Sequence, residues 1–281
     1  MIITMKEILH EAMAGQYAVG SFNVYNYETI KGVLEASKEQ KLPTIIAFGE
    51  KYLHNMDFDT VYALVSSLSR NMEISVALHL DHCSSLENVY RAIKAGFTSV
   101  MYDGSALPFE ENVANTLKVV EIAHSCNVSV EAELGSLATG LNSNEGTAED
   151  EEVYTSPRMA QEFVAKTGVD ALAVSIGTVH GMYKGEPNIR VDILKKIKER
   201  VNLPLVLHGG SGTNEKILRE CIQNGICKVN VNTEISVYTL EQTKKLLNNG
   251  NKNHLSEVSL SQILYVKEVV NKYMKLLKVQ Y

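Results

Sequence analysis

Three histidines that lie far apart in the sequence follow short apolar runs, and their type and placement suit a metal site. They are His82, His180 and His208. If the runs before them are parallel strands of one barrel, the three side chains meet at its mouth, because the carboxyl ends of all the strands lie there. A lone histidine would more often be a hydrogen-bonded structural residue. Neutral imidazoles with an acidic neighbour and an open fourth position, however, are typical of catalytic zinc, so the set predicts a metal site.

Acidic residues accompany these histidines. Asp81 directly precedes His82, and it could either orient a histidine or act as a general acid and base beside the metal. Because neighbouring strand residues point to opposite faces, its reach into the mouth depends on the local backbone. Glu131 and Glu133 share one strand face, and an unpaired glutamate would be costly on either face, which favours an interior position near a cation. His79 is expected to be a packed, hydrogen-bonded residue.

Two further segments suit the binding of phosphate. Gly209 to Gly212 directly precedes an expected helix, and Asn230 to Thr233 ends the last expected strand. Barrels often hold phosphate in the loops after strands seven and eight, through free backbone N–H groups at a helix start. Gly181 and Lys184 adjoin these loops after the sixth strand, which strengthens the prediction of a phosphate site.

The elements that must position these residues form a repeating pattern, in which a short apolar run is followed by a longer amphipathic one. The expected strands are 18–24, 43–48, 74–80, 98–102, 129–134, 171–176, 204–207 and 227–231. The expected helices include 28–40, 85–95, 109–125, 157–166, 191–200 and 214–224, with 6–14 before the first strand and 256–277 after the last. Strands that alternate with helices require parallel pairing with right-handed crossovers.

Both a closed barrel and an open, doubly wound sheet satisfy this pattern. An open sheet that bound a dinucleotide should show a G-x-G-x-x-G motif after an early strand, and none follows Val24, Phe48 or Leu80. We therefore predict an α/β fold of the TIM (β/α)8 barrel type. Residues 1–281 are expected to form a single barrel domain with an extra N-terminal helix and a C-terminal helical extension at about 255–278.

The segment from about 135 to 156 breaks this rhythm, because it is polar and longer than usual connections between a strand and a helix. Two interpretations stay open, a disordered surface insertion and a mobile active-site lid. Its position after the fifth strand favours the lid.

Composition excludes several classes of protein. The chain has 281 residues and a formal net charge of −6. This mild acidity argues against a nucleic-acid partner, and no apolar run is long enough to cross a membrane. No secretory signal is recognisable, which predicts a cytoplasmic location. The four cysteines form no C-x-x-C pair and are expected to be reduced packing residues.

Several of these segments occur in the same order in a known family. They are His79 to Cys83, Asp103 to Ser105, Leu107 to Asn112, Val130 to Gly135, Gly177 to Lys184, Leu207 to Gly212 and Lys228 to Glu234. Together they resemble the class II, zinc-dependent ketose-bisphosphate aldolases, which include the fructose-1,6-bisphosphate and tagatose-1,6-bisphosphate enzymes. The resemblance extends over nearly the whole chain, from Gly20 to Thr233.

The resemblance implies that zinc is bound by His82, His180 and His208, with Glu133 as an alternative ligand or a supporting carboxylate. Zinc would bind the ketose through its C2 carbonyl and C3 hydroxyl and act as a Lewis acid. Asp81 would remove the C4 hydroxyl proton as the C3–C4 bond breaks. The enediolate, stabilised by zinc, would then be protonated to dihydroxyacetone phosphate.

The resemblance also implies how the C1 phosphate is held, with a monovalent cation such as Na⁺ or K⁺ assisting. The binding residues would be Gly181, Lys184, Gly209, Gly210, Ser211, Asn230, Val231, Asn232 and Thr233. In the family a glutamate on the long loop protonates the carbon, within a Gly-Gly-Gln-Glu-Asp-like segment. The nearest counterpart is Gly146 to Asp150, which assigns this step to Glu149, with Glu145, Asp150 and Glu151 as competitors.

Two features bear on the substrate, and they conflict. Fructose-bisphosphate members commonly carry an arginine before the C-terminal helix for the far phosphate, whereas residues 248–264 contain none. Asn232 favours the fructose type, because tagatose enzymes tend to have alanine there. Fructose 1,6-bisphosphate is the first expectation, with glyceraldehyde 3-phosphate as the aldehyde product. Tagatose 1,6-bisphosphate, a ketose 1-phosphate or another modified sugar phosphate are the alternatives.

Two rival functions stay open, a metal-dependent isomerase or epimerase on the same barrel and an inactive barrel that binds a sugar phosphate. The intact set of Asp81 and three histidines argues against the inactive barrel. The expected partners are a small-molecule sugar phosphate and further copies of this chain in a homodimer or homotetramer.

Overall fold

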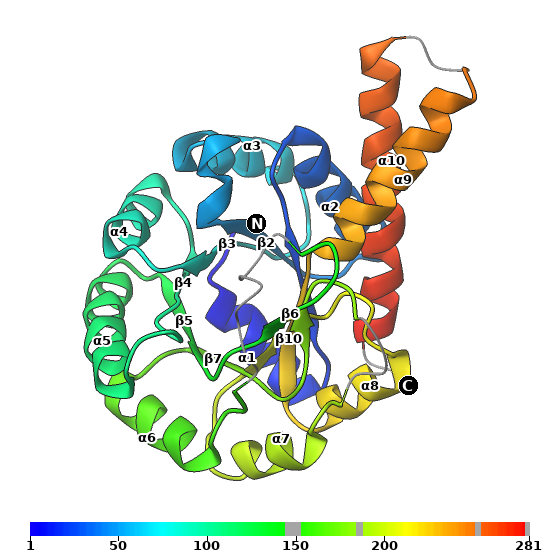
Figure 1. Ribbon diagram of the computed structural model, residues 1–281. Helices are drawn as coiled ribbons and strands as arrows, with labels where there is room; N and C mark the ends of the chain where they lie inside the picture. Colours follow the sequence, from blue (N-terminus) through cyan, green and yellow to red (C-terminus); the bar gives the residue numbers. More distant parts are fainter. Residues whose placement is uncertain (144–152, 184–187, 251–253, 279–281) are drawn as a thin grey trace.

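A closed ring of eight parallel strands forms the centre of the molecule, with helices around it (Figure 1). The computed structural model describes residues 1–143, 153–183, 188–250 and 254–278. The strand order is β1-β10-β9-β7-β5-β4-β3-β2, and the first and last strands to form, β1 and β10, pair with each other. The barrel strands are β1 (Val19–Asn23), β2 (Thr44–Gly49), β3 (Val76–Cys83), β4 (Ser99–Tyr102), β5 (Ser129–Leu134), β7 (Ala171–Val174), β9 (Leu205–Leu207) and β10 (Ile226–Val231). The predicted TIM barrel is confirmed.

Helices surround this ring in the order that alternation predicts. They are α1 (Met5–Gly15), α2 (Tyr27–Gln40), the 3₁₀ helix η1 (Glu50–His54), α3 (Phe58–Ser69), α4 (Leu86–Ala95), α5 (Phe109–Ser125), α6 (Pro157–Thr167), α7 (Val191–Lys198), α8 (Glu215–Gln223), α9 (Thr233–Asn248) and α10 (Leu255–Leu277). Helix α3 was not among the expected helices. Its N-cap Asp57 and its buried Phe58, Val61 and Val65 give a helical spacing that could have revealed it.

Two apolar cores hold the barrel. The larger one lies between the strands and the outer helices and includes Phe48, Phe97 and Phe163. The smaller one lies inside the barrel, where Met5, Ile8, Leu9 and Ala12 of α1 pack against inward-facing strand residues such as Val19 and Ala77. The N-terminal helix therefore closes the bottom of the barrel and leaves its opposite end as the mouth.

The cysteines contribute to these cores with one exception. All four are free, as predicted. Cys83, Cys221 and Cys227 are buried, but Cys126 at the end of α5 is exposed. The expected packing role is therefore wrong for Cys126, because the helix end places its side chain in solvent.

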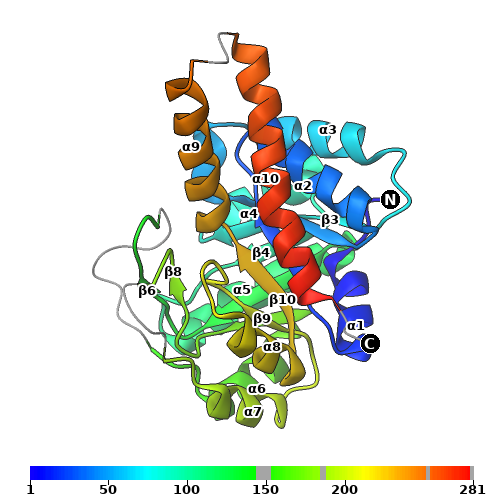
Figure 2. The same cartoon turned by 90° about the vertical axis from the view of Figure 1, so that its right-hand side faces the viewer.

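The last two helices extend beyond the barrel as an antiparallel pair (Figure 2). The inner part of α10 packs on α2, where Gly32 lets Val266 approach so closely that a Cβ atom would lie 2.7 Å from it. At its carboxyl end α10 lies along the barrel wall, and Ala18 N donates to Leu277 O at 3.1 Å. Within the described ranges, every helix is too short or too polar to span a lipid bilayer.

The long segment after β5 is ordered at both of its ends. Ser136 bridges Val153, and β6 (Ala138–Thr139) pairs in parallel with β8 (Val179–His180) in a small separate sheet. This sheet lies beside the mouth, since His180 is one of the predicted metal ligands. The middle of the segment, 144–152, lies outside the described residues, so the interpretation as a lid stays a prediction.

Candidate active site

The end of β3 has an unusual backbone that turns two neighbouring side chains toward the mouth. Strand alternation points both His79 and Asp81 into the barrel, with His79 Nε2 3.8 Å from Asp81 Oδ1. His82 then adopts a left-handed conformation with a φ of 43°, and the register between β3 and β4 shifts between Leu80 and Cys83. Such a conformation is uncommon for a residue with a side chain, and it clusters at functional sites. It lets His82 face the mouth beside Asp81, which simple alternation would not allow.

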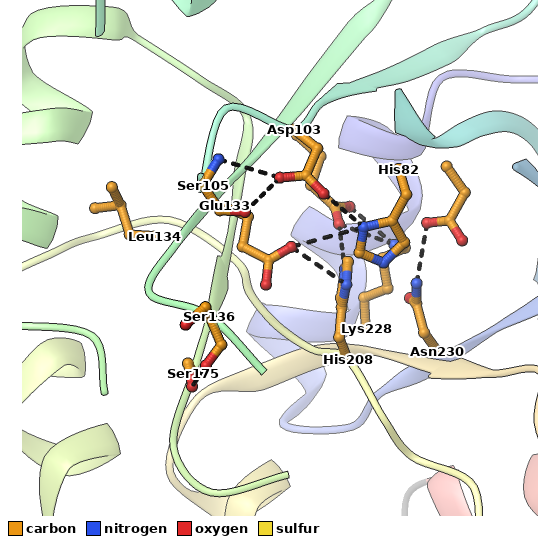
Figure 3. Close-up of polar contacts among 12 residues, drawn as sticks. His82, Asp103, Ser105, Glu133, Leu134, Ser136, Ser175, His208, Lys228 and Asn230 are labelled. Carbon is orange, nitrogen blue, oxygen red and sulfur yellow. Dashed lines mark hydrogen bonds and ion pairs between the residues drawn. The ribbon is translucent and has the colours of Figure 1, made fainter. Parts of the chain in front are cut away.

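The three predicted histidines converge at this mouth. The ring centroid of His82 lies 4.5 Å from that of His208 and 4.9 Å from that of His180. One ring nitrogen of each lies within 4.8 Å of the others. Glu133 of β5 joins them, with its Oε2 atom 3.6 Å from His208 Nδ1 and 3.8 Å from His82 Nδ1 (Figure 3). Four side chains from four segments of the chain thus share one small volume.

Two of the imidazoles are oriented by carboxylates. His82 Nδ1 lies 2.8 Å from Asp103 Oδ2, just after β4, and His208 Nε2 lies 3.0 Å from Glu131 Oε1 (Figure 3). Since a carboxylate accepts hydrogen bonds, these contacts assign the proton to those two nitrogens. The other nitrogens, Nε2 of His82 and Nδ1 of His208, then carry the lone pairs. Metal-binding histidines are typically oriented in this way.

Three buried atoms at the mouth have no hydrogen-bond partner within the described part of the chain. They are His180 Nε2, His208 Nδ1 and Glu133 Oε2. A buried polar atom without a partner costs about 1–3 kcal/mol, so this group is expected to bind something that the polypeptide itself does not supply. Imidazole nitrogens with one carboxylate oxygen are the donors that zinc prefers in catalytic sites. The residues present therefore fit a zinc ion.

The charges around the mouth favour a cation as well. Lys228 of β10 is the one buried lysine or arginine among the residues that the structure describes, and its Nζ lies 2.9 Å from Glu131 Oε2. Although burial opposes ionisation, the ammonium of Lys228 lowers the pKa of Glu131 to about 2. Burial raises the pKa of Glu133 to about 7. With Asp81 also buried, one ammonium faces three carboxyl groups, and a divalent cation would favour the ionised form of Glu133.

Asp81 is held on both of its oxygens. Asn23, at the end of β1, donates from Nδ2 to Oδ2 at 2.8 Å, and Asn230 of β10 donates from Nδ2 to Oδ1 at 3.0 Å. Burial disfavours its charge, but the positive charges of His82 and Lys228 outweigh burial and hold the pKa of Asp81 well below its usual range. Asp81 is therefore an ionised, fixed carboxylate beside the three histidines, and such a group can accept a proton from a bound molecule.

A cavity next to the histidines reaches the two predicted phosphate loops. Its walls include His82, His180, Gly181, Gly209, Ser211, Asn230, Asn232 and Thr233. Gly209 has a φ of +69°, and a Cβ atom there would lie 2.2 Å from Val179 O. A Cβ atom on Gly210 would lie 2.7 Å from Asn230 O. Glycine is therefore required at both positions because β8 and β10 approach the loop closely.

The predicted site residues differ in what the structure says of them. Gly210 N donates to Asn230 O at 2.9 Å, so this amide is already bonded within the protein. The side chain of Val231 packs in the outer core and not in the cavity. Glu149 and Lys184 lie outside the described residues. His79 is confirmed as a packed residue, with Nδ1 2.8 Å from Ser99 Oγ.

Sequence reasoning missed three residues of this site, namely Asn23, Asp103 and Lys228. Asn23 and Asp103 end the first and fourth strands or directly follow them, so the criterion applied to the other strand ends would have found both. Lys228 lies in an otherwise apolar, fully buried strand. A lysine in such a strand needs a buried carboxylate partner, which was a signal for an interior charge pair.

Comparison with known proteins gives a consistent result. The sequence profile described as "Fructose-bisphosphate aldolase class-II" matches residues 3–280. A fructose-bisphosphate aldolase of Staphylococcus aureus is 45% identical over 251 residues, which are 88% of this chain and 87% of that protein. A fructose-bisphosphate aldolase of Geobacillus stearothermophilus is 43% identical over 249 residues, which are 88% of this chain and 86% of that protein.

A solved structure supports the same relationship. The crystal structure of the YdjI aldolase from Escherichia coli K12 superimposes with a TM-score of 0.87 and 33% sequence identity, and the match covers 99% of this chain and 97% of that one. The profile and the relatives extend over the barrel and the glycine loops alike. On this evidence, the chain belongs to the class II fructose-bisphosphate aldolase family.

Proposed function

We propose that this chain is a zinc-dependent aldolase that cleaves a ketose carrying a C1 phosphate into dihydroxyacetone phosphate and an aldehyde. One observation carries the proposal. Buried lone pairs of His180, His208 and Glu133 without partners converge beside Asp81, a carboxylate that two asparagines hold in place. A Lewis-acid site next to a fixed proton acceptor is the combination that a retro-aldol reaction needs.

The proposed ligands of the zinc ion are His82, His180 and His208, with Glu133 as a fourth ligand or a supporting carboxylate. Bound zinc would supply Lewis-acid polarisation of the substrate carbonyl. Asp81 would accept the C4 hydroxyl proton while the C3–C4 bond breaks, so that C4 becomes the aldehyde carbonyl and the bonding electrons remain with C3. Glu149 stays the proposed donor of the proton that C3 then receives.

The phosphate would lie in the cavity beside the histidines. Support comes from Gly209, Ser211 and Thr233, which line it, and from the start of α9 at Thr233, where the helix dipole favours an anion. Gly181, Lys184, Gly210, Asn230, Val231 and Asn232 complete the proposed phosphate-binding set, and a monovalent cation such as Na⁺ or K⁺ is proposed to assist. A homodimer or homotetramer and a cytoplasmic location stay predictions.

The proposed substrate is fructose 1,6-bisphosphate, since relatives at 45% identity are named fructose-bisphosphate aldolase. The alternatives are tagatose 1,6-bisphosphate and a ketose 1-phosphate, because residues 248–264 contain no arginine for a second phosphate. The rate with bisphosphates relative to fructose 1-phosphate distinguishes the two groups.

The test is a substrate panel with metal-replete protein. Fructose 1,6-bisphosphate, tagatose 1,6-bisphosphate and fructose 1-phosphate are each supplied, and dihydroxyacetone phosphate is measured by coupled reduction. We expect cleavage of at least one, its loss after chelation and its return with zinc. Failure to release dihydroxyacetone phosphate from all three would reject the proposal. A product with the carbon count of the substrate would indicate an isomerase.

A further inference from the structure

A tyrosine on the C-terminal helix reaches the glycine loop from outside the barrel. Tyr273 of α10 is only 1% exposed. Its hydroxyl oxygen lies 3.2 Å from the amide nitrogen of Gly212 and 3.3 Å from Gly210 O. It also donates to Oε2 of Glu234, in the first turn of α9, at 2.5 Å. One hydroxyl group thus connects α10, α9 and the loop that follows β9.

Glu234 fixes the same loop through two further bonds. Its Oε2 accepts from Gly212 N at 3.2 Å, and its own amide donates to Ser211 Oγ at 3.2 Å. Its other oxygen pairs with Lys272 of α10. Burial and the charge of Glu234 raise the pKa of Tyr273, so the phenol keeps its proton and remains a donor. A hydrogen bond to a buried carboxylate is stronger than one between neutral groups.

These contacts divide the loop into an anchored part and an open part. The amides of Gly210 and Gly212 are bonded within the protein, to Asn230 O and to Glu234 with Tyr273. Gly209 and Ser211 instead line the cavity beside the histidines. Gly212 has a φ of +73°, a conformation that glycine adopts readily but that a loop must be held in to persist. Anchoring from α9 and α10 therefore determines how Ser211 is presented.

We infer that Tyr273 is a positioning residue for phosphate binding, whose hydroxyl, together with Glu234, holds the loop from Gly209 to Gly212 in the shape that receives the substrate phosphate. The inference rests on the proposed function, because it takes this cavity as the phosphate site. It predicts that a residue of the C-terminal helix, outside the metal site, sets the affinity for phosphate and leaves the affinity for zinc unchanged.

The test replaces Tyr273 with phenylalanine, which keeps the ring and removes only the hydroxyl. A matched control is Tyr238→Phe, because Tyr238 of α9 donates to Glu268 of α10 at 2.6 Å in the same kind of bond, away from the loop. The probes are inorganic phosphate, titrated into zinc-loaded protein, and zinc itself. For Y273F we expect the Kd for phosphate to rise about 3- to 10-fold, the range of one lost hydrogen bond. The KM for the cleaved ketose should rise similarly.

In the same variant kcat and zinc affinity should change less than about twofold, a division that a general loss of folding would not produce. Glu234→Gln is the second variant, and it should weaken phosphate binding even if Y273F folds poorly. The inference is overturned if Y273F and E234Q bind phosphate as the wild type does, or if Y238F loses as much affinity. If the wild type binds no phosphate and cleaves no ketose phosphate, the proposed function fails and the inference fails with it. Phosphate binding that persists in Y273F rejects the inference alone.

Discussion

His208 Nε2 lies 3.0 Å from Glu131 Oε1 at the centre of the barrel, and this contact determines which imidazole nitrogen faces the mouth. Glu131 in turn lies 2.9 Å from the buried ammonium of Lys228. The pair therefore presents a neutral combination to the barrel interior while its carboxylate still orients His208. Since an oriented imidazole loses less freedom on binding a metal, the pair should strengthen the proposed zinc site.

The combined replacement of Glu131 with glutamine and Lys228 with methionine tests this role. The double variant avoids a single buried charge, which would cost about 3–5 kcal/mol. We expect the affinity for zinc to fall about 10- to 100-fold, measured by competition with a colorimetric chelator. The control removes an ion pair on the surface of α8, where Arg219 lies 2.6 Å from Glu215. Wild-type zinc affinity in the barrel double variant would show that the pair has no such role.

Asp81→Asn should abolish most turnover, because an amide cannot accept the C4 hydroxyl proton. We expect kcat to fall about 10²- to 10⁴-fold with zinc content unchanged, as measured by elemental analysis of the purified protein. Asn23→Ala removes one of the two amides that hold Asp81 and should reduce kcat by a smaller factor. An active Asp81→Asn enzyme would exclude Asp81 as the proton acceptor.

Gly32→Ala should destabilise the fold, although helix propensity alone would favour alanine by about 1 kcal/mol. A Cβ atom at this position would lie 2.7 Å from Val266 and 2.9 Å from Ile263 O, both on α10. We expect the free energy of unfolding to fall by about 1–3 kcal/mol, measured by urea denaturation. The same change in a Val266→Ala background should cost less, because the side chain that it meets is smaller. An equal cost in both backgrounds would argue against this contact.

Thiol reactivity should separate the cysteines into two groups. Burial raises the pKa of Cys221 to about 12 and that of Cys227 to about 11, and it also raises the pKa of Cys83. Thiolate is the reactive form, so at pH 8 the exposed Cys126 should react first with an aromatic disulfide reagent. One equivalent should be released rapidly from the native protein and four after denaturation. Cys126→Ser should lack the rapid phase, and rapid release of more than one equivalent would contradict the burial of the other three.

The amino-acid sequence determined the barrel and most of the proposed metal site. Alternation of apolar and amphipathic runs located all eight barrel strands, because burial on both faces makes such strands continuously apolar. His82, His180 and His208 could be grouped because every strand of a parallel barrel ends at the same mouth. The family resemblance then suggested zinc and the role of Asp81.

The tertiary structure decided what depends on contacts between distant segments. Whether Asp81 and His82 could both face the mouth depended on the φ of 43° at His82, which the neighbouring strand stabilises and which no local pattern revealed. The pairing of Lys228 with Glu131, 97 residues apart, likewise needed the closed ring. Tyr273 meets Gly212 only because α10 returns along the barrel wall. Sequence patterns record which face a residue buries, whereas the partner it meets there is determined by how the whole chain packs.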